Sequence, residues 1–179
     1  MRIARRLFVV PLANDRHGKS TMIRGLVSQG LGENVALQKK GKRSLTSPWG
    51  RPIDAYIFGR SYQEKEKAKY GTVENTLRAN DSEWHKRELI IMPSHVAAYD
   101  HPDIEEMIVA GHRAGFDMIA ASVILFGPNG DNRAAFPDIW EMNWDERWTI
   151  PNPHIAKPEG QLEALGRDLW TWICQALAS

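Results

Sequence analysis

The 179-residue chain has almost no cysteine and almost no excess of either charge. Its single cysteine, Cys174, cannot form a disulfide within the chain, and no cluster of thiolate metal ligands is possible. A reducing compartment is therefore the simplest environment. Lysine and arginine number 23 against 22 aspartate and glutamate residues, which leaves a net charge of +1. This balance excludes a polybasic surface for nucleic acid or anionic lipid, so any anion site must be local.

Long apolar runs are also missing. No stretch approaches the roughly 18 to 20 apolar residues that cross a bilayer. The amino-terminal run spans only Leu7 to Ala13 before polar residues follow, which favours a first strand over a signal peptide. These features predict a cytoplasmic protein without membrane contact. The chain is 42% apolar and 25% charged, which suits one globular domain over residues 1–179.

Hydrophobic periodicity predicts strands and helices in alternation. Strands are expected at residues 7–12, 35–39, 88–92, 118–126 and 148–150, with helices from residue 19 to about 30 and at 102–115 and 159–177. Residues 39–60 show no regular period and are expected to form a long loop or lid. Residues 61–87 should form one or two solvated helices broken near Gly71. The alternation predicts an α/β fold: a three-layer α/β/α sandwich with a mainly parallel sheet of about five strands.

The turn after the first strand carries the clearest chemical pattern. It runs from Ala13 to Thr21 with the sequence ANDRHGKST. In such folds ligands bind at the carboxyl ends of the strands, and the amides that open a helix attract anions. The turn resembles the phosphate-binding loop of P-loop NTPases, GxxxxGK(S/T), with Ala13 in place of the first glycine. If that position requires a positive φ, alanine costs about 1 kcal/mol more than glycine.

This resemblance implies that the chain binds ATP, or another nucleoside triphosphate, with Mg²⁺. By motif position, Gly18 allows close approach of the backbone, Lys19 contacts the β and γ phosphates, and Ser20 ligates Mg²⁺. Thr21 contacts the α phosphate. The remaining residues that surround the phosphates are Asn14, Asp15, Arg16 and His17.

A second catalytic element of these proteins is an acidic residue that follows a neighbouring strand and organises Mg²⁺ and the attacking water. Here the strand at 88–92 ends in a Pro-Ser-His sequence without a carboxylate. Ser94, His95 and Asp100 are candidates to supply the missing function, although Asp100 is better placed to cap the next helix. Asp54 is a further candidate for the outer shell of the metal.

Two weaker signals fit a nucleotide at the same edge. Asn152 follows the last strand, where related ATPases often place an asparagine against the base, and Arg133 could act as a lid over phosphates. Only one other strand separates the two motif-bearing strands. In this respect the chain resembles the division of P-loop proteins in which the two motif-bearing strands are neighbours. That division contains nucleotide kinases, GTPases and the ParA, MinD and dethiobiotin-synthetase-like ATPases. Asn14 stands where ParA and MinD relatives carry an extra lysine.

Three functions follow from these observations. The first is a Mg²⁺-dependent NTPase that acts as a switch, the second is a small-molecule kinase, and the third is an interaction module that keeps only the fold. The tryptophans at 140, 144 and 148 either pack in the core or dock a protein partner or a second copy. The basic cluster Lys39–Arg43 is either a solvated loop or a contact for nucleic acid or an acidic substrate.

Overall fold

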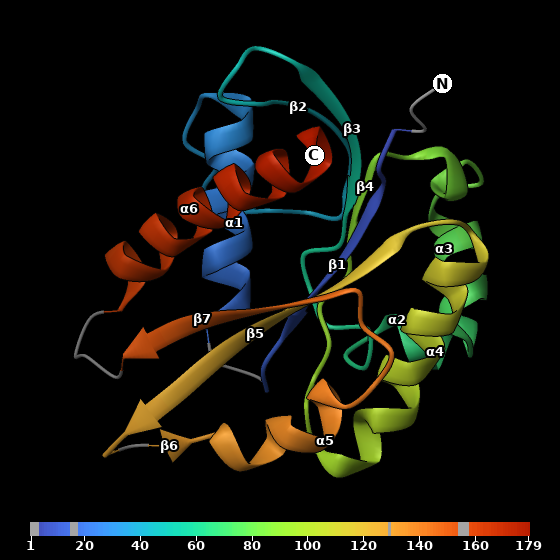
Figure 1. The fold of residues 1–179 in the computed structure, drawn as a ribbon, viewed down its shortest axis with the longest axis vertical. Helices are drawn as coiled ribbons and strands as arrows, with labels where there is room; N and C mark the ends of the chain where they lie inside the picture. Colours follow the sequence, from blue (N-terminus) through green and yellow to red (C-terminus); the bar gives the residue numbers. More distant parts are fainter. Residues whose placement is uncertain (1–3, 15–17, 129, 154–157) are drawn as a thin grey trace.

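The computed structural model describes residues 4–14, 18–128, 130–153 and 158–179 and has an α/β fold, which confirms the predicted class (Figure 1). Its helices and strands are, in chain order, β1 (Leu7–Leu12), α1 (Lys19–Leu31), β2 (Gly41–Thr46), β3 (Pro52–Ile57), α2 (Glu66–Tyr70), α3 (Val73–Asn80), β4 (Leu89–Ile91), α4 (His101–Arg113), β5 (Asp117–Gly127), β6 (Gly130–Asp131), α5 (Phe136–Trp140), β7 (Glu146–Pro153) and α6 (Glu159–Ala178). Within these ranges no helix is long and apolar enough to span a membrane.

The strands form one mixed, seven-stranded sheet. Strands β3, β4, β1, β5 and β7 are parallel and adjacent in that order, whereas β2 pairs antiparallel with β3 and β6 pairs antiparallel with β5. β1 lies between β4 and β5, with Leu7 opposite both Leu89 and Asp117. All six residues of β1 are buried, as its unbroken apolar sequence predicts for a strand covered on both faces.

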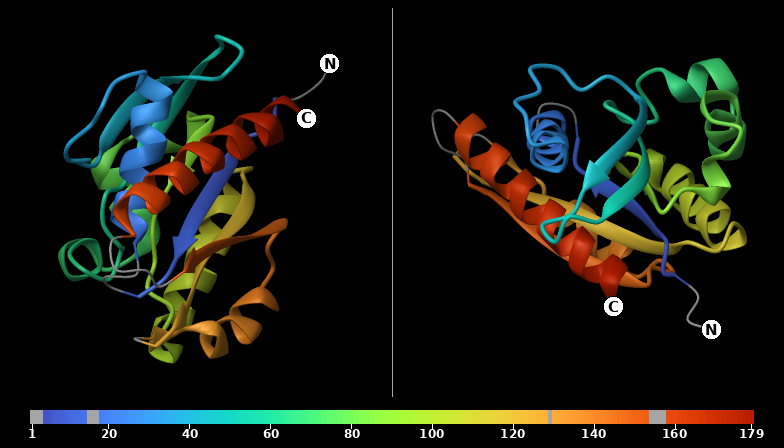
Figure 2. Two further views of the ribbon diagram at one scale, coloured as in Figure 1. Left: turned by 90° about the vertical axis from the view of Figure 1, so that its left-hand side faces the viewer. Right: turned by 90° about the horizontal axis from the view of Figure 1, so that it is seen from above.

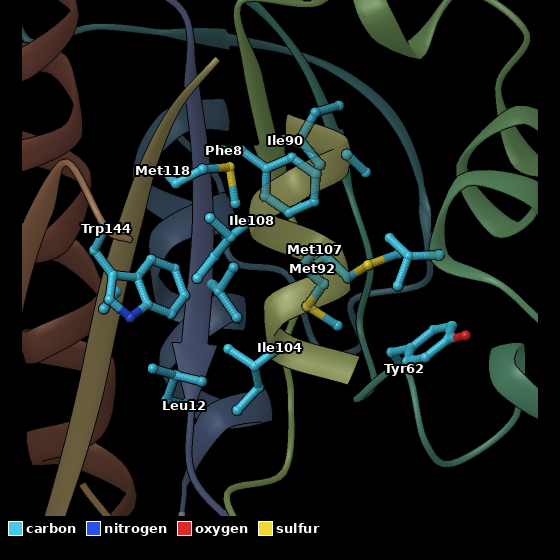
Figure 3. Packing of buried hydrophobic residues seen from close by; sticks show 14 of the residues in the cluster. Phe8, Leu12, Tyr62, Ile90, Met92, Ile104, Met107, Ile108, Met118 and Trp144 are labelled. Atoms are coloured by element: carbon cyan, nitrogen blue, oxygen red, sulfur yellow. The ribbon is translucent and has the colours of Figure 1, made fainter. Parts of the chain in front are cut away.

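Helices cover the sheet from both sides (Figures 1 and 2). Successive residues of β1 point to opposite faces, so Leu7 and Val9 pack in one core with α1 and α6, while Phe8 and Val10 pack in the other with α3, α4 and α5. Figure 3 shows Phe8 between Met118 of β5 and Ile90 of β4, its partners in the register. Burial on both faces fixes the position of the loop that follows β1.

One predicted strand is wrong and one hairpin was not predicted. Residues 35–39 form no strand, and the β2–β3 hairpin instead occupies most of the segment expected to be a loop or lid. β2 lies at the edge of the sheet and buries only Leu45, so it has no apolar run to reveal it. The sequence signal that could have indicated the hairpin is Gly50, a turn residue between two extended segments. In the structure it has a φ of 81°.

The segment after the hairpin agrees with the prediction. The helical region breaks at Gly71, which has a φ of 81° and separates α2 from α3. The short helix α5, inside the tryptophan-rich connection, was not predicted. The thiol of Cys174 is buried, and burial raises its pKa to about 12, which makes the cysteine unreactive.

The tryptophan-rich connection packs inward in the structure. The indole nitrogens of Trp140, Trp144 and Trp148 donate hydrogen bonds within the chain, and none of the three side chains is exposed. Core packing therefore explains this group. On α6, Trp170 is fully buried while Trp172 is 39% exposed, because residues two positions apart in a helix lie on different faces.

Helices α1 and α6 approach each other closely at Gly166 of α6. A Cβ atom there would collide with the carbonyl oxygen of Met22 and lie 2.9 Å from the amide nitrogen of Leu26. Both are backbone atoms of α1, so no side chain can rotate to make room. The glycine lets the helix that carries Lys19 pack against the carboxyl-terminal helix.

We expect Gly166→Ala to lower the free energy of unfolding by about 1–3 kcal/mol, because the added methyl group would push the helices apart. Gly160→Ala is the matched control on α6, since nothing lies within 4 Å of its added Cβ. The control should be neutral or raise stability by up to about 1 kcal/mol. Urea unfolding followed by circular dichroism measures both, and equal effects would contradict the close packing.

Candidate functional site

The candidate site begins at the loop between β1 and α1. Gly18 is the N-cap residue of α1 and has a φ of 96°, a left-handed conformation that glycine adopts without strain. A Cβ atom there would also lie 2.6 Å from a methyl carbon of Leu162. Two independent constraints therefore require glycine at the position predicted for close backbone approach. Asp15, Arg16 and His17 lie outside the described residues, and their roles stay predictions.

Lys19 is the first residue of α1 and is only 7% exposed. Its ammonium group donates hydrogen bonds to the carbonyl oxygens of Ala13 and Asn14, the latter at 3.0 Å. Burying a cation is costly unless it is hydrogen-bonded, so these contacts hold the side chain inside the loop. A bound polyphosphate would have to replace those carbonyl groups as the partner of the ammonium.

The two hydroxyl residues after Lys19 differ in exposure. Ser20 is exposed, with its Oγ atom 3.5 Å from the carbonyl oxygen of Gly59, just after β3. Thr21 is half-buried in the first turn of α1. An exposed hydroxyl at the start of a helix fits the metal-ligating role predicted for Ser20. Ala13 is fully buried, and its amide donates to the carbonyl of Ser94 at 3.2 Å, so that amide is not directed at a ligand.

The chain after β4 runs alongside the loop. We call residues 93–96 the elbow. Ser94 continues the parallel pairing of β4 opposite Leu12, and its amide donates to the carbonyl of Pro11 at 2.9 Å. The amide of Val96 donates to Oδ1 of Asn14 at 3.1 Å. The side chain of Asn14 therefore ties the loop to the elbow.

Ser94 is buried beneath this junction, and its catalytic role stays a prediction. Its side chain is fully enclosed, accepts a hydrogen bond from Nε2 of Gln63 at 2.9 Å and donates to the carbonyl of His95 at 2.8 Å. Sequence analysis missed Gln63, whose Oε1 also accepts the amide of His95. No local motif marks this glutamine, because only the parallel register of β3 and β4 brings it to the elbow.

The carboxylate of Asp100 lies buried beyond the elbow. Asp100 occupies the N-cap position of α4 without making a side-chain cap bond, so the predicted capping contact is wrong. Its Oδ2 atom and Nε2 of His95 are buried without a hydrogen-bond partner among the described residues. Burial raises the pKa of Asp100, and the nearby charge of Asp103 adds to the rise, whereas His95 opposes it. The pair has the chemistry of a proton donor or acceptor.

Asp103 is the other carboxylate near the elbow, and it is already neutralised. Lys67 lies 2.9 Å from its Oδ1, and Gln63 donates to its Oδ2 at 3.2 Å. This ion pair raises the pKa of Lys67, through the hydrogen bond to Asp103. Asp103 therefore anchors the segment after β3 to α4, whereas Asp100 forms no ion pair among the described residues.

Asp54 lies well away from the loop, and its role in the outer shell of the metal stays a prediction. It lies within β3, one residue before Ala55, which pairs with Leu89 and through it with Leu7. The loop follows Leu12, five residues further along the parallel strands, or roughly 16 Å away at 3.3 Å per residue. The carboxylate of Asp54 instead forms an ion pair with Arg87 at 2.8 Å.

Asn152 lies at the same edge of the sheet as the loop. It is buried in β7 opposite Leu125, three residues beyond the level of Ser122, the partner of Leu12. This placement keeps it a candidate for contact with a nucleotide base. Arg133, predicted as a lid arginine, is exposed, and its guanidinium lies 2.6 Å from the carboxylate of Asp131.

A pocket of about 380 Å³ opens beside Ser20, since Gly59 lines it. We call it the basic pocket, lined by Leu37, Gln38, Lys39, Lys40, Phe58, Gly59, Arg60, Ser61, Lys65 and Glu66. Two members of the basic cluster predicted from sequence, Lys39 and Lys40, contribute to it. No group of three histidine, cysteine or acidic residues suited to a metal occurs in the described part of the chain.

We expect Asp100→Asn to stabilise the protein at neutral pH. A carboxyl group with a raised pKa favours folding while it is protonated, and this contribution is lost as the pH rises through the folded-state value. The gain from the neutral amide should therefore be present at pH 7 and shrink as the pH falls toward about 4. Urea unfolding across this range measures it. Asp138→Asn, an exposed change on α5, is the control, and a pH-independent gain in Asp100→Asn would contradict the argument.

Comparison with known proteins assigns no family to this chain. No model of a known protein family matches it, and no curated protein is similar to it in sequence. The chemistry of the loop, the elbow and the basic pocket is therefore what bears on its function.

Proposed function

We propose that this chain binds a nucleoside triphosphate, with ATP the foremost candidate, and Mg²⁺ at the loop from Ala13 to Thr21. The observation that carries the proposal is the buried ammonium of Lys19, held inside a loop that opens a helix through the left-handed Gly18. The amides at the start of α1 and the helix dipole favour an anion at this point.

The sheet supports a finer proposal about the fold, that of a P-loop-like three-layer sandwich with a mainly parallel sheet. Strands β1 and β4, which precede the loop and the elbow, are direct neighbours. Adjacent motif-bearing strands are the arrangement of the division that includes kinases, GTPases and the ParA and MinD ATPases. The run of five parallel strands, with helices on both faces, is consistent with it.

Individual residues take distinct roles in this proposal. Lys19 would exchange the carbonyls of Ala13 and Asn14 for phosphate oxygens, and the exposed hydroxyl of Ser20 would help to hold Mg²⁺. When bound, Mg²⁺ neutralises charge on the phosphates. Thr21 lies one residue further along α1, and Asn152 lies at the same sheet edge for contact with the base. Positioning and electrostatics would carry the chemistry.

Hydrolysis coupled to a conformational switch is the first candidate reaction. The loop is hydrogen-bonded to the elbow through Asn14 and Ala13. A change in phosphate contacts at Lys19 would therefore shift the elbow through these hydrogen bonds. The neighbouring Asp100 and His95 offer a buried acid or base in a chain that lacks a carboxylate directly after β4. The switch would then alter contacts with a protein partner.

A small-molecule kinase is the second candidate, favoured by the basic pocket beside Ser20. A hydrolytic switch needs only water as the acceptor, whereas a pocket next to the expected phosphates could hold a second substrate. The absence of an acidic residue at the usual water-organising position also favours transfer over hydrolysis.

Lys19→Ala should weaken ATP binding by at least about tenfold, because a charge-assisted hydrogen bond to phosphate contributes about 1.5–3 kcal/mol. Titration calorimetry in the presence of Mg²⁺ measures the dissociation constant. Lys86→Ala, a change of an exposed lysine paired with Glu83, is the matched control and should bind as the parent protein does. Equal affinity of the Lys19→Ala variant and the parent protein for ATP would contradict the proposal that this loop binds the nucleotide.

The products formed from ATP should distinguish the candidate functions. A switch should release ADP and inorganic phosphate at a rate independent of added metabolites, whereas a kinase should form a phosphorylated metabolite and little free phosphate. Phosphorus NMR of ATP incubated with the protein and a metabolite extract follows both products. ATP that neither binds nor reacts under either condition would favour the interaction module.

A further inference from the structure

The basic pocket has two walls that come from different parts of the chain. One wall is the segment before β2, residues 37–40, and the other is residues 58–61 after β3, continued by Lys65 and Glu66 at the start of α2. The walls touch where a Cβ on Gly59 would lie 2.5 Å from the carbonyl oxygen of Gln38. The two walls therefore approach each other so closely at this point that only glycine fits there.

Two buried polar atoms on these walls have no partner. Gln38 is 9% exposed and Ser61 is 2% exposed, yet Oε1 of Gln38 and Oγ of Ser61 make no hydrogen bond within the described residues. The amide nitrogen of Gln38 is already used by the carbonyl of Lys39, so its free atom is an acceptor. Buried polar groups are normally hydrogen-bonded, so Oε1 of Gln38 points to a ligand that supplies a donor, and Oγ of Ser61 to one that supplies a donor or an acceptor.

Apart from the ion pair between Lys40 and Glu66, the charged residues that line the pocket are all positive. Lys40 lies 2.7 Å from the carboxylate of Glu66, which also accepts a hydrogen bond from Asn80. No carboxylate in the described ranges forms an ion pair with Lys39, Arg60 or Lys65. Lys39, Arg60 and Lys65 therefore line the pocket without an ion-pair partner among the described residues, although the whole chain is nearly neutral.

We propose that the basic pocket binds a small phosphate monoester that carries a hydroxyl group. The doubly charged phosphate would pair with Lys39, Arg60 and Lys65, and Arg60 offers the planar fork that suits phosphate oxygens. The hydroxyl would donate to Oε1 of Gln38, and Oγ of Ser61 can donate or accept. Buried Phe58 provides an apolar surface for the carbon skeleton.

This proposal rests on the proposed function where it assigns the ester as a phosphoryl acceptor. A hydroxyl oxygen of the bound ester forms a bond to the γ phosphorus of ATP, and the bond from that phosphorus to the β–γ bridging oxygen breaks. The hydroxyl proton passes to solvent, and the products are ADP and a bisphosphate. Binding to the pocket itself needs no nucleotide, so it can be tested separately from the loop.

The test follows backbone amide NMR signals of the full chain during titration with glycerol 3-phosphate, ribose 5-phosphate and glucose 6-phosphate. At least one ester should cause saturable shifts of the amides at residues 38–40 and 59–61. The matching unphosphorylated compound should cause none, and inorganic phosphate should bind more weakly. Absence of saturable shifts at these amides with all three esters would overturn the proposal.

Variants separate the pocket from the loop. Arg60→Gln should weaken ester binding by about tenfold or more, and Ser61→Ala should weaken it less, because the charged contact is the stronger. Lys69→Gln, an exposed change on α2 outside the lining, should leave the affinity unchanged. Lys19→Ala should retain ester binding even if it loses ATP. An Arg60→Gln variant that binds the ester as tightly as the parent protein would contradict the assignment.

Discussion

The contact between the ammonium of Lys19 and the carbonyl oxygens of Ala13 and Asn14 is the interaction on which the proposed site depends. It places a buried positive charge at the amino end of α1, where the helix dipole already favours anions. A cation in such a place is stable only while its partners remain in position. In the proposed function, the ammonium exchanges these internal oxygens for phosphate oxygens without the lysine first having to come in from solvent.

The parallel register of β1 and β4 determines what surrounds that lysine. Because β4 runs beside β1, its continuation brings Ser94 opposite Leu12 and lets Val96 donate to Asn14. The same register, extended to β3, brings Gln63 against Ser94. Loop, elbow and the segment after β3 thus form one hydrogen-bonded unit. A change of partner at Lys19 would reach the walls of the basic pocket through this unit.

The sequence predicts those parts of the fold whose signals are local. β1 is an unbroken apolar run, and Gly18-Lys19 marks the start of α1, so both were placed correctly. The β2–β3 hairpin was missed because an edge strand that buries only Leu45 has no apolar pattern. The position of Asp54 could not be predicted without the hairpin, since its distance from the loop follows from the pairing of β3 with β4.

The same reasoning explains why the candidate site was predicted only in part. The residues from Ala13 to Thr21 lie together in the sequence, so a motif can reveal them. Gln63, Asp100 and the walls of the basic pocket come together only through the sheet, and no spacing in the sequence marks them. The wrongly predicted strand at 35–39 hid one wall of that pocket. A strand there would have paired Gln38 with a neighbouring strand, whereas the irregular segment forms a wall of the pocket, with Oε1 of Gln38 buried and without a hydrogen-bond partner among the described residues.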